Sequence, residues 1–286
     1  MTLLIAGYGD LGQTLAQQLQ TQPHWRDTPT LALSRNPGAS SSSVNWLAAD
    51  LLDPRSLDEL AGHTKAVSHV VYCAAPRERG QQAYRDTYVV GLQNLVRHLK
   101  RVAPHRLPAF LFVSSTGVYD ACAQGVIDEQ SPTEPSRYTG QILLEAERWL
   151  EANWPGAIIL RLSGIYGPNR QQLLRAIASG QATLPEGNDY WANRIHVDDA
   201  AGAILHLFQN HQAGVFIGTD CQPRPLRELY TQIAQLLNVD TPPAGPASPM
   251  MGKKRLSNQK LLDTGYVFRW PDCIEGYRQI IAQTPL

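Results

Sequence analysis

The stretch Leu3-Leu4-Ile5-Ala6-Gly7-Tyr8-Gly9-Asp10-Leu11-Gly12 opens the chain and predicts its fold. The four apolar residues predict a buried strand, and the apolar face formed by Leu11, Leu15 and Leu19 predicts a helix. The glycines between them have the spacing GxGxxG, which is informative for nucleotide binding when it joins a strand to a helix. We therefore expect a strand, a phosphate-binding turn and a helix.

Each glycine has its own role in such a turn. Gly7 permits the tight turn, Gly9 lets the backbone approach a pyrophosphate, and Gly12 permits close packing of helix and strand. The start of the helix, at Asp10 and Leu11, presents backbone N–H groups to the phosphates. The alternative is a glycine turn that serves packing alone.

The residues after the second expected strand (residues 30–33) indicate which dinucleotide is preferred. An NAD site places Asp or Glu about 20 residues after the glycines, whereas this chain has Ser34 and Arg35. A hydroxyl and a guanidinium hold a 2′-phosphate that a carboxylate would repel. We expect NADP(H), with NAD as the second candidate; the alternative is an exposed arginine at a strand end.

Two further strand ends complete the expected nucleotide site. Asp50 and Leu51 follow the third strand, where they would border the adenine. Cys73, Ala74 and Ala75 follow the fourth strand and are small enough to lie close to the ribose.

Short apolar strands alternate with amphipathic helices before residue 164. We expect strands at residues 3–6, 30–33, 44–47, 69–74, 110–113 and 157–162, and helices at 11–19, 89–102 and 142–150. This order predicts an α/β fold, a doubly wound parallel Rossmann-type sheet with a small C-terminal substrate lobe. Residues 1–164 would form the NAD(P)-binding domain, with returns near 195–218, and residues 165–286 the interleaved substrate-binding lobe.

The pattern changes in the second half of the chain. We expect a strand at residues 214–217 and helices at 173–177, 198–208, 225–237, 257–262 and 274–281. Asp198 is expected to cap its helix, and His196 to help fix the helix entry rather than do chemistry. Residues 240–251 contain four prolines and are expected to be irregular, and the serines within residues 39–43 to form a surface loop.

The composition argues against several partners. Lys+Arg and Asp+Glu both number 25, so net charge gives no reason to expect nucleic acid or an anionic membrane as a partner. No apolar run approaches the roughly 18 residues of a membrane span, and the first apolar segment is too short for a signal peptide. The four cysteines lack metal-ligand spacing to each other or to histidine, so we expect free thiols, no metal site and a cytoplasmic protein.

Four later segments resemble one family. Residues 113–119 (VSSTGVY), 161–168 (RLSGIYGP), 194–199 (RIHVDD) and 254–258 (KRLSN) follow the glycine turn in order. In them the chain resembles the extended and atypical branches of the short-chain dehydrogenase/reductase superfamily, the NAD-dependent epimerase/dehydratase family. The likeness covers essentially the whole chain.

The resemblance implies a Ser/Tyr/Lys catalytic site. Ser115 matches the serine that polarises the substrate oxygen, and Tyr138 the tyrosine that exchanges its proton while hydride moves to or from the nicotinamide. Four residues after the tyrosine, where the family has lysine, this chain has Ile142. A phenol with a pKa near 10 needs a nearby cation to act as a base near pH 7, and Ile142 supplies none.

Three interpretations stay open: an NAD(P)-dependent oxidoreductase or epimerase/dehydratase-like enzyme with an altered Ser/Tyr site, a non-catalytic NADP-binding regulator or scaffold, and a site rebuilt from other residues. Thr116, Tyr119, Tyr166 and Arg194 are expected at the substrate, with packing or an ion pair as the alternative. The segment 169–195 is shorter than in nucleotide-sugar enzymes, which favours a small sugar, carbonyl or alcohol.

The resemblance also implies a homodimer. Members of the family often pair through two long helices, which correspond here to the helices expected near residues 89–102 and 142–150. Periodicity does not distinguish such an interface from core packing.

Replacing Arg35 tests the choice of cofactor. Arg35→Asp should weaken the binding of NADPH and spare that of NADH, because a carboxylate repels the 2′-phosphate that only NADPH carries. Calorimetric titration with each dinucleotide measures both affinities. Unchanged binding of both would contradict the assignment.

Overall fold

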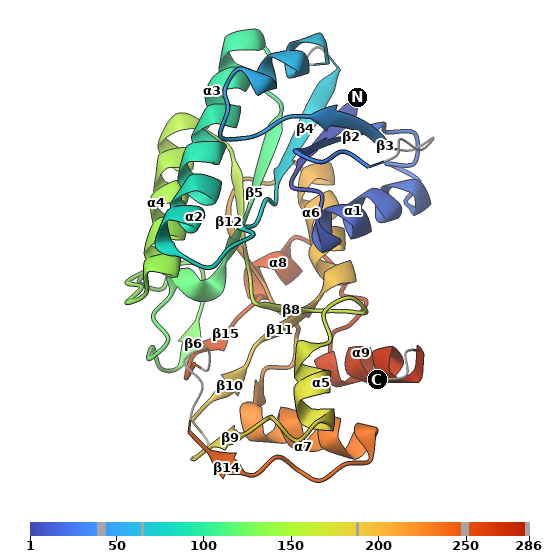
Figure 1. The fold of residues 1–286 in the computed structure, drawn as a ribbon, viewed down its shortest axis with the longest axis vertical. Coiled ribbons are helices and arrows are strands. Elements are labelled where there is room, and N and C mark those ends of the chain that lie inside the picture. The colour runs from blue at the N-terminus through green and yellow to red at the C-terminus, as the bar shows by residue number, and fades with distance from the viewer. Residues whose placement is uncertain (39–43, 64–65, 187–188, 247–251, 284–286) are drawn as a thin grey trace. The chain divides into compact units, whose positions relative to one another are not determined.

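A computed structural model describes residues 1–38, 44–63, 66–186, 189–246 and 252–283 (Figure 1). Within these ranges no helix is both long enough and apolar enough to cross a membrane. Residues 39–43, with their serine run, lie outside the described residues, as do residues 247–251 of the proline-rich segment.

Seven strands form one parallel sheet, and the predicted fold class is confirmed. In spatial order they are β12 (Gly214–Gly218), β7 (Ile158–Leu162), β5 (Ala109–Ser115), β4 (Val67–Tyr72), β1 (Thr2–Ala6), β2 (Thr30–Ser34) and β3 (Val44–Ala48). In β1, Leu4 lies opposite Leu31 of β2 and Val70 of β4. The chain leaves β1 toward β2 and later returns to its other side at β4, which is the topological switch point where such sheets bind ligands.

Helices cover both faces of this sheet (Figure 1). They are α1 (Asp10–Thr21), the 3-10 helix η1 (Ser56–Gly62), α2 (Gln81–Arg85), the π-helical turn η2 (Asp86–Gly91), α3 (Leu92–Val102), the 3-10 turn η3 (Thr116–Val118), α4 (Tyr138–Asn153) and α6 (Val197–Gln209). Leu3, Leu4 and Ile5 of β1 have no exposed surface, as expected for a strand covered on both faces.

The helix expected from residue 89 begins eight residues earlier. The segment from α2 through η2 to α3 runs without a break from Gln81 to Val102. Its first five residues, α2, include the polar Gln81, Gln82 and Arg85, and none of the five is buried, so they gave no apolar periodicity. Tyr84 and Tyr88 thus lie on a helical segment that the sequence pattern missed.

The chain divides into two compact units, each assembled from separate segments. Unit 1 comprises Met1–Val118, Ser136–Arg161 and Ala201–Phe216, and unit 2 comprises Tyr119–Pro135, Leu162–Ala200 and Ile217–Leu286. The boundary expected at residue 164 and the substrate-binding role of the lobe stay predictions.

Unit 2 contains short strand pairs and several helices. Its strands are β6 (Val126–Ile127), β8 (Gly164–Tyr166), β9 (Leu184–Pro185), β10 (Trp191–Ala192), β11 (Arg194–His196), β13 (Arg224–Pro225), β14 (Ala244–Gly245) and β15 (Arg255–Leu256). Its helices are α5 (Gln172–Ala178), α7 (Leu226–Leu237), α8 (Gln259–Asp263) and α9 (Cys273–Gln283). Leu174, Leu229, Ile233 and Tyr277 lie in its apolar core.

One expected helix cap is wrong. α6 begins at Val197, so Asp198 lies inside the helix rather than before it. The backbone N–H of Asp198 donates to Nδ1 of His196 at 3.1 Å, so the imidazole provides the cap. The expectation that His196 fixes the helix entry is confirmed.

Candidate dinucleotide and catalytic site

The glycine turn after β1 is tightly packed at two glycines and open at the third. Gly7 has a φ of +104°, and a Cβ there would lie 2.6 Å from the carbonyl carbon of Cys73. A Cβ on Gly12 would lie 2.7 Å from the Gly7 carbonyl oxygen. At Gly9, by contrast, no described residue other than its neighbours along the chain comes within 4 Å of the position of a Cβ. The open position is the one where a pyrophosphate has to approach the backbone.

The start of α1 faces this turn without a side-chain cap from the described residues. Gly9 is the N-cap, its carbonyl accepts from the Gln13 N–H at 2.9 Å, and Asp10 begins the helix. The first N–H groups of a helix have no partner within the helix, and together with the helix dipole they attract anions. The turn therefore has the shape and the polarity that a bound diphosphate requires.

Cys73 and Ala74, which follow β4, lie directly against the turn, whereas the expected approach of Cys73, Ala74 and Ala75 to a ribose stays a prediction. The Cys73 thiol donates to the Gly7 carbonyl at 3.0 Å, and its backbone N–H donates to Ala6 at 2.9 Å. Burial raises the pKa of the Cys73 thiol to about 12, so the side chain is a neutral hydrogen-bond donor at pH 7. Cys73 thus fixes the turn and is a poor nucleophile.

The end of β2 presents Ser34 and Arg35. The Ser34 hydroxyl accepts from the Asn36 N–H at 3.2 Å and is 3.1 Å from the Asn36 carbonyl, so it shapes the local turn. The Arg35 side chain is exposed and forms no ion pair with any residue in the described ranges. An exposed guanidinium at this strand end fits either a 2′-phosphate or solvent.

An aromatic pair beside the turn was missed by the sequence analysis. The Tyr8 ring meets the Trp46 ring of β3 edge-on, with centroids 4.8 Å apart. Burial raises the pKa of Tyr8. The pair packs the glycine turn toward the far edge of the sheet, and a single aromatic residue between two glycines gives no sequence signal for it.

The segment after β3 is fixed by local hydrogen bonds. Oδ1 of Asp50 accepts from the Leu52 N–H at 3.0 Å, and the Ser56 hydroxyl bonds the Asp50 backbone at 2.9 Å. The Leu51 carbonyl accepts from Nδ2 of Asn94 in α3 at 2.9 Å. Asp50 and Leu51 are therefore held in place at a strand end, and their contact with an adenine stays a prediction.

Ser115 and Tyr138 come from neighbouring elements of unit 1. Ser115 ends β5, where its hydroxyl accepts from the Gly117 N–H at 3.1 Å. Tyr138 is the first residue of α4, which packs against β5 and η3, and 37% of it is exposed. Ile142, one turn further along α4, is 2% exposed. The tyrosine is accessible to a ligand, whereas the side chain at the lysine position points into the protein interior.

Two more tyrosines adjoin Tyr138. The rings of Tyr84 and Tyr138 meet edge-on with centroids 5.7 Å apart, and Tyr88 lies 5.5 Å from Tyr84. The pKa of Tyr84 is raised, first by burial and then by Tyr138, whereas the positive charge of Arg79 opposes the rise. The candidate site thus includes a tyrosine cluster that depends on the unpredicted start of the helix at Gln81.

A buried ion pair joins α4 to the sheet. Oε2 of Glu147 in α4 lies 2.7 Å from Nη2 of Arg161 in β7, and the Ser114 hydroxyl of β5 donates to Oε1 of Glu147 at 2.5 Å. Glu147 is 1% exposed and Arg161 6%. The network fixes the helix that carries Tyr138 relative to the strand that carries Ser115.

The remaining predicted substrate residues are largely buried. Thr116 is 7% exposed, Tyr119 1% and Tyr166 2%. In unit 2, the Tyr119 carbonyl accepts from Nζ of Lys254 at 3.0 Å, and the Tyr166 ring stacks on Tyr277 with centroids 4.3 Å apart. These contacts match the packing alternative, and a role in substrate binding stays a prediction.

Arg194 belongs to a polar region of unit 2. Its carbonyl accepts from the Asp220 N–H at 2.6 Å. Burial raises the pKa of Asp220 to about 7, opposed first by hydrogen bonds from Cys273 and more weakly by the charge of Arg194. No ion pair joins Arg194 to another residue in the described ranges, and its contact with an anionic substrate stays a prediction.

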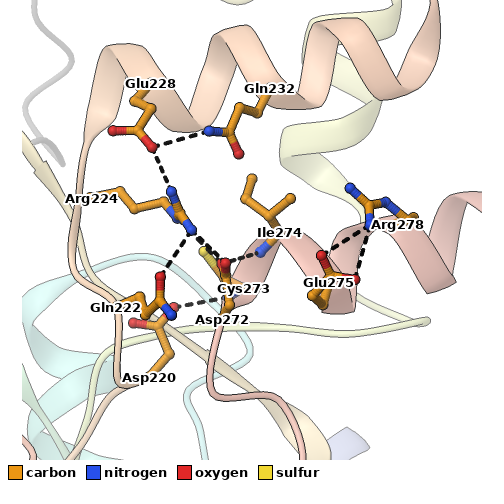
Figure 2. A network of polar contacts seen from close by, with 10 residues as sticks. All are labelled: Asp220, Gln222, Arg224, Glu228, Gln232, Asp272, Cys273, Ile274, Glu275 and Arg278. Atoms are coloured by element: carbon orange, nitrogen blue, oxygen red, sulfur yellow. Dashed lines mark hydrogen bonds and ion pairs between the residues drawn. The ribbon is translucent and has the colours of Figure 1, made fainter.

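Figure 2 shows the network that continues from Asp220. Oδ2 of Asp220 accepts from the Cys273 N–H at 3.2 Å, and Oδ1 of Asp272 accepts from Ile274 at 2.9 Å. Arg224 bridges Asp272 and Glu228 of α7. Asp220 and Asp272 accept hydrogen bonds from the first backbone N–H groups of α9, and Arg224 joins the start of α9 to α7. The network is therefore structural.

The parallel sheet, the switch point and the open glycine turn define a dinucleotide-binding protein of the Rossmann type. The sequence model of the NAD dependent epimerase/dehydratase family matches residues 3–217. The chain belongs to this family.

Individual relatives align along nearly the whole chain. Protein YeeZ of Escherichia coli K12 is 30% identical over 94% of this chain and 96% of its own. A 3-diazoavenalumate denitrifying reductase of a Streptomyces species is 26% identical over 87% of this chain and 85% of its own. A solved structure from Methylobacillus flagellatus, described as a candidate NAD-dependent epimerase/dehydratase, is 34% identical, with a TM-score of 0.79 over 99% of this chain and 98% of the other.

Removing the carboxylate of the buried ion pair should destabilise the protein. Glu147→Gln leaves the Arg161 guanidinium buried without its counter-charge, and loss of one partner of such a pair costs about 3 kcal/mol or more. Urea unfolding followed by circular dichroism measures the change in the free energy of unfolding.

Glu145→Gln is the matched control on the same helix. Glu145 forms a two-bond ion pair with Arg85 at 2.8 Å, but the two side chains are 44% and 41% exposed. Its loss should cost less than about 1 kcal/mol. Equal effects of the two substitutions would contradict the role given to Glu147.

Proposed function

We propose that the protein is an NADP(H)-linked oxidoreductase that reduces a small carbonyl compound or a related small substrate, using Ser115 and Tyr138. The observation that carries the proposal is the glycine turn, which is closed at Gly7 and Gly12 and open at Gly9 beside the start of α1. Membership of an NAD-dependent family supports the general class of the reaction.

The residues present fit the cofactor. The backbone at Gly9 and the start of α1 would hold the diphosphate, and Ser34 with Arg35 would hold the 2′-phosphate. When bound, the reduced dinucleotide supplies a hydride to the substrate carbon. The preference for NADP(H) rests on Arg35 and on the lack of a carboxylate in that place.

The altered site favours reduction over oxidation. In the direction of reduction the tyrosine hydroxyl donates a proton, and this role does not need the lysine cation that would help a tyrosine to act as a base. Ser115 would polarise the substrate oxygen, and Tyr138 would give that oxygen a proton as the carbonyl becomes an alcohol. Solvent then returns a proton to the partly exposed Tyr138.

The substrate is proposed only as a class. The short segment 169–195 argues against a large nucleotide sugar. The Streptomyces relative, which aligns over most of both chains, is by its name a reductase. Both points support a small reducible compound.

Removing the Tyr138 hydroxyl should slow the reaction. Oxidation of NADPH is followed at 340 nm with a panel of small carbonyl compounds, and Tyr138→Phe should lower turnover of any active compound by about 100-fold or more. Tyr84→Phe, which keeps the ring beside Tyr138, serves as the comparison. Two results would contradict the role proposed for Tyr138. One is undiminished turnover in Tyr138→Phe, and the other is a loss in Tyr84→Phe as large as that in Tyr138→Phe.

A second candidate function is a non-catalytic NADP-binding regulator or scaffold. The observation that favours it is Ile142, which is 2% exposed and offers no charge at the position of the family's lysine. Such a protein would bind NADPH and leave it unoxidised with every compound of the panel.

Ile142→Lys separates the two functions. If the parent is inert and the variant oxidises NADPH, the regulator interpretation gains; turnover by the parent excludes it. Because burial disfavours an ammonium, the variant should also unfold more easily than the parent, by a few kcal/mol. Ile142→Met, a volume-conserving change, is the control and should cost less than about 1.5 kcal/mol.

A further inference from the structure

A partly open cavity of about 410 Å³ lies in unit 1, between the segment that follows β3 and α3. It is lined by Pro54, Arg55, Asp58, Asn94, Arg97, His98 and Arg101. None of these residues belongs to the proposed dinucleotide or catalytic site, and the volume is within the range of small-molecule sites.

The cavity concentrates positive charge in a protein whose net charge is zero. Three arginines, Arg55, Arg97 and Arg101, and a single acidic residue, Asp58, are among the residues that line it. Their formal sum is three positive charges and one negative, which leaves two positive charges when the histidine is neutral. Such an excess favours a ligand with at least two negative charges.

Nδ1 of His98 lies close to both charged residues, 3.1 Å from Nη2 of Arg101 and 3.8 Å from Oδ1 of Asp58. Because a guanidinium only donates, Nδ1 accepts from Arg101 and the ring proton is on Nε2. Nε2 is buried and has no partner among the described residues. The pKa of His98 is lowered, first by burial and then by the charge of Arg101, whereas Asp58 opposes the shift.

The arginines retain capacity for a ligand. Arg55 makes no side-chain hydrogen bond or ion pair within the described ranges, and Arg97 bonds only through Nη2 to Gln93, at 2.9 Å, while its guanidinium lies 5.7 Å from the centre of the Trp149 ring. Arg101 pairs with Asp58, but these side chains are 63% and 57% exposed, so their ion pair is weak. An anion can therefore gain charge-assisted hydrogen bonds without breaking a buried pair.

We propose that this cavity binds a compact oxyanion with two or more negative charges, either a phosphate or a polycarboxylate. The planar guanidinium fork matches both groups in two-bond geometry. Asn94, which lines the cavity, also donates to the Leu51 carbonyl, so an occupied cavity would be linked to the strand end expected at the adenine. The proposal of this anion site does not depend on whether the protein reduces a carbonyl compound.

Calorimetric titration of the full chain at low ionic strength tests the site. The probes are inorganic pyrophosphate and citrate, which separate phosphate from carboxylate chemistry. We expect one equivalent of at least one probe to bind, and Arg55→Gln and Arg97→Gln each to weaken it about tenfold, the loss of one charged hydrogen bond. Circular dichroism verifies that both variants are folded.

Two further variants locate the binding. Arg148→Gln removes an exposed charge from α4 outside the cavity and should leave the affinity unchanged. Arg35→Asp tests whether the probe binds at the glycine turn instead. The proposal is overturned if neither probe binds, or if binding survives Arg55→Gln and Arg97→Gln together, or if Arg35→Asp abolishes it.

Discussion

The buried pair of Glu147 and Arg161, with the Ser114 hydroxyl, is the constraint on which the candidate catalytic site depends. It joins α4 to two central strands in a region where an unpaired charge is costly. Because Ser114 directly precedes Ser115, and Tyr138 begins the helix that carries Glu147, this one network determines where both candidate catalytic side chains lie. Such a network helps to hold two catalytic groups at a fixed distance and orientation.

The replacement of lysine by Ile142 changes what that anchored site can do. The buried isoleucine adds to the core, and the Tyr138 ring contacts Tyr84, which in turn contacts Tyr88. Donation of a proton by Tyr138 does not need the missing lysine, and this is the reason why we propose reduction of a small carbonyl compound. The presence of Ile142 in place of lysine also supports the competing proposal, in which the protein binds NADP without catalysing a reaction.

The sequence predicted the features that depend on local patterns and missed those that depend on distant partners. The turn at Gly7 was predictable because its backbone tolerates only glycine, and the strands because their residues are continuously apolar. The helix start at Gln81 was missed because its first residues form no buried apolar face. The cap of α6 was assigned to Asp198, a usual capping residue, although the His196 imidazole provides it. The pairing of Glu147 with Arg161 joins a helix to a strand, and only tertiary packing determines it.

The central claim is that the glycine turn after β1 holds a dinucleotide with a 2′-phosphate. Calorimetric titration of the purified protein with NADPH and, separately, with NADH tests this claim most directly. The account predicts that NADPH binds with one equivalent per chain and more tightly than NADH. Binding of neither dinucleotide would mean that the glycine turn is structural here, and it would contradict both the proposed reduction and the regulator alternative.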